Sequence, residues 1–211
     1  MKRAVWRLLV CSLVCLSPNA ATAGPMAELT LQSQPGDFIG QGQTEEIIYT
    51  PSNSNLFGAQ ILTNLDVSGQ PAFLRFDFGT VTGSNSTNTF STLDFATNEL
   101  NLPFQPGIYT DAMRASFATA GHPGLDVTFQ NRGNNTLTGS FTVNSVSFFL
   151  NASNVEQIGS LDVNFEQHSE GATPALFGRL VYSASVPEPA TLALLGLGLA
   201  GLATVRRRKS H

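Results

Sequence analysis

Apolar and polar residues alternate one by one through much of the chain between Gly24 and Ser185. The segments 74–78, 125–129 and 161–165 each place an apolar side chain at every second position, with charged or polar side chains between them. This alternation is typical of strands with one buried face, because successive side chains of a strand point to opposite faces. Apolar residues do not recur every three to four positions over any stretch long enough for a helix. The pattern therefore predicts an all-β domain.

Turn-forming residues divide the same region into short pieces. Further strands are expected at 45–50, 59–67, 138–150 and 175–183, separated by turns rich in Gly, Asn, Ser and Pro. Short strands with such turns favour a single antiparallel β-sandwich of jelly-roll type.

Four details of this domain are less regular. Apolar residues occupy odd-numbered positions up to Val143 and even-numbered positions from Val146 onward. This change predicts a β-bulge near Asn144. Residues 111–119 are ambiguous and are expected to form a strand. Residues 24–43 have little pattern and are expected to add an edge strand or to remain irregular. The polar stretch 82–89 is expected to form a long loop.

Charge excludes one class of partner. Of the 11 basic residues, three precede Gly24 and four follow Val205, which leaves four arginines against 14 acidic side chains in the central region. The net charge of this region is therefore about −10, and it contains no lysine. Phosphate binding needs clustered Lys and Arg, so we expect no nucleic-acid partner.

The amino-terminal segment has the pattern of a secretory signal. A basic start precedes an apolar stretch, Leu8–Leu16, and small residues then suit cleavage before the central region, so residues 1–23 are expected to be a signal helix that is removed. Cys11 and Cys15 lie inside the apolar stretch and would leave with it, so the mature chain would have no disulfide and no thiol. The residues assigned to the cleavage site are Ala21, Ala23 and Gly24.

The carboxyl-terminal segment, residues 186–211, has three parts. The prolines exclude a helix at its start, and the uncharged run 190–205 would reach roughly 24 Å as a helix, slightly less than the ~30 Å hydrocarbon core of a bilayer. The basic cluster after it places the carboxyl terminus in the cytoplasm and residues 24–185 outside. The residues assigned to sorting are Val186, Pro187, Glu188, Pro189, Arg206, Arg207, Arg208 and Lys209.

This three-part tail resembles the PEP-CTERM sorting signal of bacterial exported proteins. The resemblance implies an exosortase-type processing enzyme as a partner, with cleavage near the Pro-Glu-Pro motif. It also implies a host that makes exopolysaccharide and biofilm. The expected location is an inner-membrane-anchored precursor with its domain outside the cytoplasm, followed by the cell surface or the extracellular matrix.

A second resemblance lies within the central region. Residues 107–112, 123–127, 132–133, 165–171 and 175–178, with the run Phe-Glu-Gln-His-Ser-Glu-Gly among them, resemble a domain of exported bacterial proteins to which no activity is attached. In that pattern cysteines occupy the positions of Asn134 and Ser169, and the resemblance implies that those cysteines would pair across strands. This chain would rely on packing alone.

One group of residues suggests metal chemistry. If the strand at 161–165 continues, Glu166, His168 and Glu170 project from its outward face, about 7 Å apart at alternate positions. A straight strand holds them too far apart for one ion, so zinc or calcium would need a bend. Otherwise His168 would bond to backbone or to a carboxylate, and a glutamate would pair with Arg132 or Arg179. We therefore assign no metal or other cofactor, and keep the three residues as candidate ligands.

Catalytic motifs are missing from the sequence. There is no Gly-x-Ser-x-Gly elbow, no phosphate loop and no Cys/His cluster, and the other histidine of the region, His122, is expected in a turn. Carboxylates from different strands could still form a glycosidase pair. We therefore expect a non-catalytic structural or binding protein associated with exopolysaccharide. The alternative is a lectin or a carbohydrate-active or metal-dependent enzyme on the same scaffold.

Overall fold

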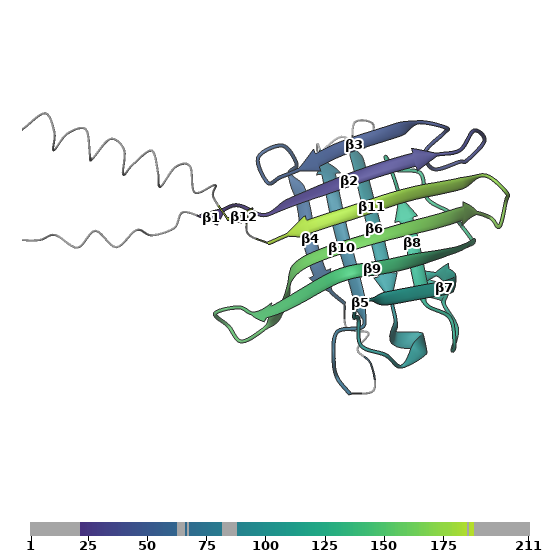
Figure 1. Cartoon of the computed structure of the whole chain (residues 1–211). Helices are drawn as coiled ribbons and strands as arrows, with labels where there is room; N and C mark the ends of the chain where they lie inside the picture. The colour runs from purple at the N-terminus through teal and green to yellow at the C-terminus, as the bar shows by residue number, and fades with distance from the viewer. Residues whose placement is uncertain (1–21, 63–65, 67, 82–87, 185, 188–211) are drawn as a thin grey trace, which may run out of the picture. The chain divides into compact units, whose positions relative to one another are not determined.

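The computed structural model describes residues 22–62, 66, 68–81, 88–184 and 186–187 (Figure 1). The chain divides into two compact units, one of residues Met1–Thr22 and Pro187–His211 and one of residues Ala23–Val186. Nearly all the described residues belong to the second unit. The expected signal helix, the expected transmembrane helix 190–205 and the loop residues 82–87 lie outside them. Within the described ranges, the structure contains no helix that is both long enough and apolar enough to cross a membrane.

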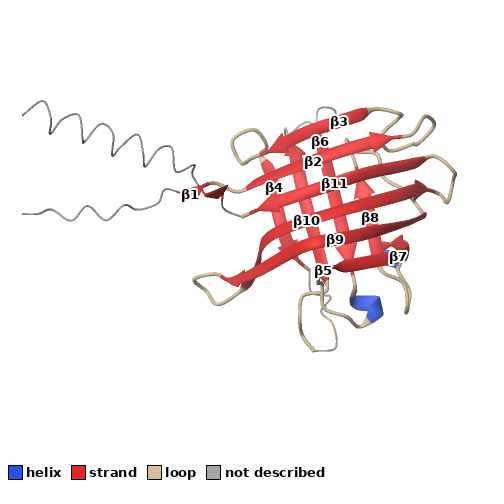
Figure 2. Ribbon diagram, viewed as in Figure 1, coloured by secondary structure: helices blue, strands red, loops and turns tan. Residues whose placement is uncertain are grey.

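The regular secondary structure of the second unit is almost entirely strand (Figure 2). Two short 3-10 helices, η1 (Asn98–Leu100) and η2 (Ala115–Phe117), interrupt them. The strands are β1 (Thr22–Ala23), β2 (Met26–Ser33), β3 (Thr44–Tyr49), β4 (Leu56–Ile61), β5 (Phe73–Thr80), β6 (Thr89–Ala96), β7 (Gly107–Arg114), β8 (Gly124–Thr128), β9 (Leu137–Leu150), β10 (Glu156–Ser169), β11 (Ala175–Ser183) and β12 (Val186–Pro187).

Ten of these strands form one sheet that folds over itself. Its order is β3-β2-β11-β10-β9-β7-β8-β6-β5-β4, and every pair is antiparallel except β7 with β8. Strands β2, β3, β9, β10 and β11 make one layer, and β4, β5, β6 and β8 cross behind it at a steep angle (Figure 1). The all-β prediction is confirmed. The two layers belong to a single, nearly closed sheet, with β7 joining one layer to the other.

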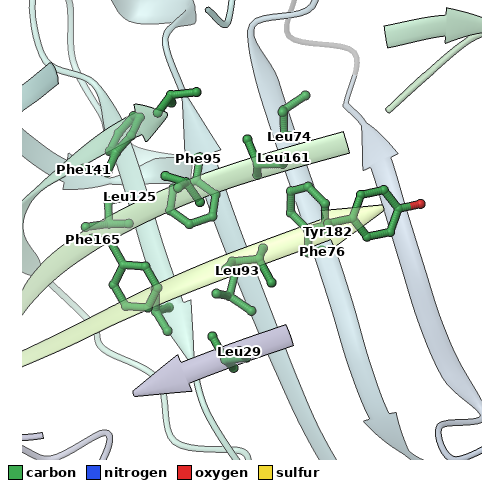
Figure 3. Packing of buried hydrophobic residues seen from close by; sticks show 14 of the residues in the cluster. Leu29, Leu74, Phe76, Leu93, Phe95, Leu125, Phe141, Leu161, Phe165 and Tyr182 are labelled. Carbon is green, nitrogen blue, oxygen red and sulfur yellow. The ribbon is translucent and has the colours of Figure 1, made fainter. Parts of the chain in front are cut away.

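Alternate residues of the two layers meet in the core (Figure 3). Tyr109 stacks on Phe141 with ring centroids 4.8 Å apart, and Phe95 meets Phe141 edge to face at 5.5 Å. Phe76 of one layer likewise meets Tyr182 of the other at 5.3 Å. Aromatic pairs of this geometry stabilise a fold by about 0.5–1.5 kcal/mol beyond the effect of their buried area. The alternate apolar residues predicted to be buried therefore form the core.

Most strand predictions agree with the structure. Strands β3, β9 and β11 match the expected ranges. The strand expected at 59–67 is β4, which begins and ends earlier, and the strand expected at 111–119 is β7, which begins at Gly107 and ends at Arg114 before η2. The bulge expected near Asn144 is present, because Asp162 faces Ser145 whereas Val163 faces Val143.

The amino-terminal part of the domain differs from the expectation. Residues 26–33 form β2, which is neither an edge strand nor irregular but lies between β3 and β11. Ala27, Leu29 and Leu31 are buried in the main core. The alternation in this segment looked weak in the sequence because one of these three buried positions holds the small residue Ala27.

Candidate functional site

A groove of about 500 Å³ lies on the solvent face of β7, β9 and β10. Residues 110–113 of β7, residues 138–140 of β9 and two side chains of β10 line it, and His122 joins them from the loop before β8. The groove therefore gathers chain segments that are far apart in the sequence. Its lining residues are Thr110, Asp111, Ala112, Met113, His122, Thr138, Gly139, Ser140, Glu166 and His168.

A bulge in β7 shapes one wall of this groove. The register between β7 and β9 shifts between Tyr109 and Ala112, and Asp111 adopts a left-handed backbone with φ of 57°. Its carbonyl oxygen lies 2.9 Å from His122 Nδ1, so the histidine donates to it. A β-bulge redirects side chains locally, and here it fixes the histidine loop against the strand.

The opposite wall carries the pair Glu166 and His168. His168 Nδ1 donates to the carbonyl oxygen of Ala172 at 2.9 Å, and Nε2 lies 2.9 Å from Glu166 Oε1. Both ring nitrogens are therefore engaged in holding the strand and the following turn. His168 bonds to backbone and to a carboxylate, which is one of the two arrangements expected from the sequence.

Glu170 does not join this pair. Strand β10 ends at Ser169, and Glu170 has a left-handed backbone with φ of 52°. Its carboxylate accepts hydrogen bonds from the Thr136 hydroxyl at 2.6 Å and from the backbone N–H groups of Thr136 and Asn135. These bonds lower the pKa of Glu170, the Thr136 hydroxyl most of all.

The line of three ligands considered at 166, 168 and 170 is therefore wrong, because the strand stops one residue too early. The structured part of the chain contains no group of three His, Cys, Asp or Glu side chains that could hold a metal ion. The expected pairing of a glutamate with Arg132 or Arg179 is wrong as well. Arg132 donates to the Ile39 carbonyl oxygen, and Arg179 pairs with Asp162 at 2.8 Å.

Two ion pairs lie in the second layer, on β5, β6, β7 and β8. Arg75 donates two hydrogen bonds to Asp94, of 2.8 and 2.6 Å, and Arg114 Nε donates one to Asp126 Oδ2 at 2.8 Å. Asp94 and Asp126 face each other across β6 and β8. Burial raises the pKa of both carboxyls, and the arginines oppose that effect. Asp126 Oδ1 is buried with no partner. The two ion pairs therefore link neighbouring strands, but the burial of their charges costs free energy.

Sequence reasoning missed one buried polar residue, Gln167. It is fully buried, and its side-chain amide bridges the layers to the backbone of Val127, accepting from N–H at 2.8 Å and donating to C=O at 3.0 Å. It follows Leu161, Val163 and Phe165 in the same parity, so the alternation itself was the signal that it points inward.

The two positions where the second resemblance has cysteines are also buried. Ser169 Oγ donates to Asp37 Oδ1 at 3.2 Å, whereas Asn134 Nδ2 has no partner. Polar side chains thus occupy both positions, and the ends of β9 and β10 rely on hydrogen bonds and packing.

The sorting and cleavage residues lie near the limits of the described chain. Val186 and Pro187 form β12, which pairs with β1 at Thr22–Ala23. Ala21, Glu188, Pro189 and the basic cluster 206–209 lie outside the described residues.

Comparison with protein families identifies this tail. The model of the PEP-CTERM protein-sorting motif matches residues 185–209. The chain carries a PEP-CTERM sorting signal. It is therefore an exported protein that is sorted by exosortase, a membrane enzyme that processes such tails.

The PEP-CTERM match does not extend into the β domain. No curated protein and no solved structure matches the chain. The resemblance of residues 107–178 to other exported bacterial domains has no support from these comparisons.

Proposed function

We propose that this exported protein is a non-catalytic surface or matrix component that binds a hydroxyl-rich polymer such as exopolysaccharide. Its precursor is anchored in the inner membrane by residues 190–205, with the β domain outside the cytoplasm. Exosortase then cleaves near the Pro-Glu-Pro motif, and the domain passes to the cell surface or the matrix. The observation that carries the binding role is the groove on β7, β9 and β10, most of whose lining residues have polar side chains.

The groove suits sugar hydroxyls for a chemical reason. Thr110, Thr138 and Ser140 offer hydroxyl groups that both donate and accept, and Glu166 adds a charged acceptor. Thr138, Ser140 and Glu166 lie on strands held by continuous β9–β10 pairing, so little ordering of their backbone is needed when a ligand binds. Because the domain carries about −10 charge, a neutral polymer fits better than a strongly acidic one.

Calorimetric titration of the exported protein with purified exopolysaccharide from its host tests this role. Ser140→Phe would fill the groove and is expected to weaken binding at least about tenfold, or roughly 1.4 kcal/mol. Ser147→Phe is a matched control, because it lies on the same strand outside the groove lining and is exposed. Equal affinity of the two variants would contradict the assignment of the groove.

A catalytic role is the second candidate, because Asp111 and Glu166 both line the groove. Paired carboxylates on a sugar-binding surface can hydrolyse glycosides. The test is release of reducing ends from the same polysaccharide. Activity that is lost in Glu166→Gln while binding persists would replace the non-catalytic proposal.

A further inference from the structure

The hairpin formed by β9 and β10 extends beyond the rest of its layer (Figure 1). Strand β11 pairs with β10 only from Ser160 onward, and the described pairing of β7 with β9 begins at Val143. We call residues 144–159 the arm. At its outer end residues 148–150 pair only with residues 156–158, whereas at its base residues 145–147 pair with residues 160–162. Register shifts at Asn144 and Gly159 mark the base of the arm, where bulges increase twist and bend the strands.

Three large apolar side chains at the tip of the arm are exposed, beside the polar turn 151–154 and the exposed Glu156. Phe149, Leu150 and Val155 are 46, 61 and 51% exposed, and the turn residues between them carry no charge. Phe149 and Leu150 are successive residues of β9, so their side chains leave on opposite faces. Neither face of the domain alone can cover both. An environment that surrounds the tip would bury all three side chains.

The direction of the arm relates this tip to the membrane. Ser183, the last residue of β11, faces Ser160 of β10, so the arm extends past the point where the chain leaves the sheet toward the sorting signal. Four residues from Ser160 to Glu156 carry the arm roughly 13 Å further. Only six residues, 184–189, separate Ser183 from the apolar run, and they span at most about 20 Å.

We propose that the arm is a membrane-docking element of the anchored precursor, whose apolar tip enters the lipid surface beside the tail. Membrane binding becomes more favourable in proportion to the apolar side-chain area that is buried in the lipid interface. The short linker keeps the domain close enough for the arm to reach the bilayer. Contact at a second point restricts the tilting of the domain, which holds the Pro-Glu-Pro segment at a fixed height for exosortase. This inference rests on the anchoring of the precursor proposed above.

Lipid quenching of an introduced tryptophan tests the proposal. Trp6 is the single tryptophan of the chain and lies in the signal segment, residues 1–23, so the anchored precursor without that segment provides a background free of tryptophan emission. Phe149→Trp in that background is reconstituted into phosphatidylethanolamine–phosphatidylglycerol vesicles with or without brominated acyl chains. We expect its emission to shift to shorter wavelength and to lose intensity in the brominated vesicles. Val155→Trp, on the other side of the turn, is a second reporter with the same expectation.

Phe117→Trp is the matched control. Phe117 is 64% exposed and lies beside Leu137 at the opposite end of β9 from the tip. It should show neither the shift nor the loss. Emission at 149 and 155 that matches the control, whether all are quenched or none is, would overturn the proposal. Flotation separates this failure from a failure of anchoring, because unanchored chain does not float with the vesicles.

Discussion

Replacing Gln167 with leucine tests how the two layers are held together. The residue is fully buried, and its amide satisfies the N–H and C=O groups of Val127 at 2.8 and 3.0 Å. Leucine has a similar size, so the change removes two hydrogen bonds with little new cavity. Both backbone groups of Val127 would then be buried without partners.

The expected loss of stability follows from those two groups. A buried donor or acceptor without a partner costs about 1–3 kcal/mol, and the better burial of leucine offsets part of the sum. We expect the free energy of unfolding to fall by about 2–4 kcal/mol. For a domain of this size that corresponds to roughly 5–15 °C in Tm. Urea unfolding followed by far-ultraviolet circular dichroism measures the change.

Gln157→Leu is the matched control on the same strand. Its side chain is only half-buried, and it donates locally to the Glu156 carbonyl oxygen. It should change stability by no more than about 0.5 kcal/mol. If both variants unfold at the same urea concentration as the parent, the bridge between the layers contributes nothing and the reasoning is refuted.

Two further predictions concern the tail and the surface. Alanine at all three positions of Pro187–Pro189 should leave export intact but prevent processing, and a normal processed mass of the exported protein would contradict the sorting assignment. Pairing with Arg179 lowers the pKa of Asp162 from 3.8, so the pair stabilises the fold above that pH and the contribution is lost as pH falls through the lowered value. Arg179 is half exposed, so the contribution is at most about 1 kcal/mol. Asp162→Asn should remove it, and unfolding measured between about pH 6 and 2.5 should show a smaller acid-dependent loss than in the parent.

Most of the strands were predictable because their signal is local, although the central position of β2 and the existence of β6 were not predicted. In β5, Leu74, Phe76 and Phe78 are buried while Arg75 and Asp77 remain half-buried, as alternation requires. The same parity argument predicted the bulge at Asn144. Applied to Gln167, the same parity would have placed this side chain inside, but its polar character concealed the position and it was missed.

The sheet order and the groove were not predictable from local patterns. Asp111 of β7 and His168 of β10 line the same groove, and that grouping depends on β9 lying between the two strands. No spacing in the sequence encodes this order. The three-ligand hypothesis failed for a related reason, since it assumed that the strand continues to Glu170. The turn at Gly171 instead places Glu170 in a left-handed conformation.

The positions of the groove and the arm on the same two strands have a consequence for the anchored precursor. The groove includes Ser140, and the tip of the arm includes Leu150 at the end of the same strand. Ten residues of strand separate them by roughly 33 Å. An arm that docks on the bilayer therefore keeps the groove well away from the lipid surface and open to a polymer. Binding of exopolysaccharide would then not have to wait for cleavage of the tail. The anchored and processed forms should accordingly bind the same polysaccharide with equal affinity, and weaker binding by the anchored form would show that the groove faces the membrane.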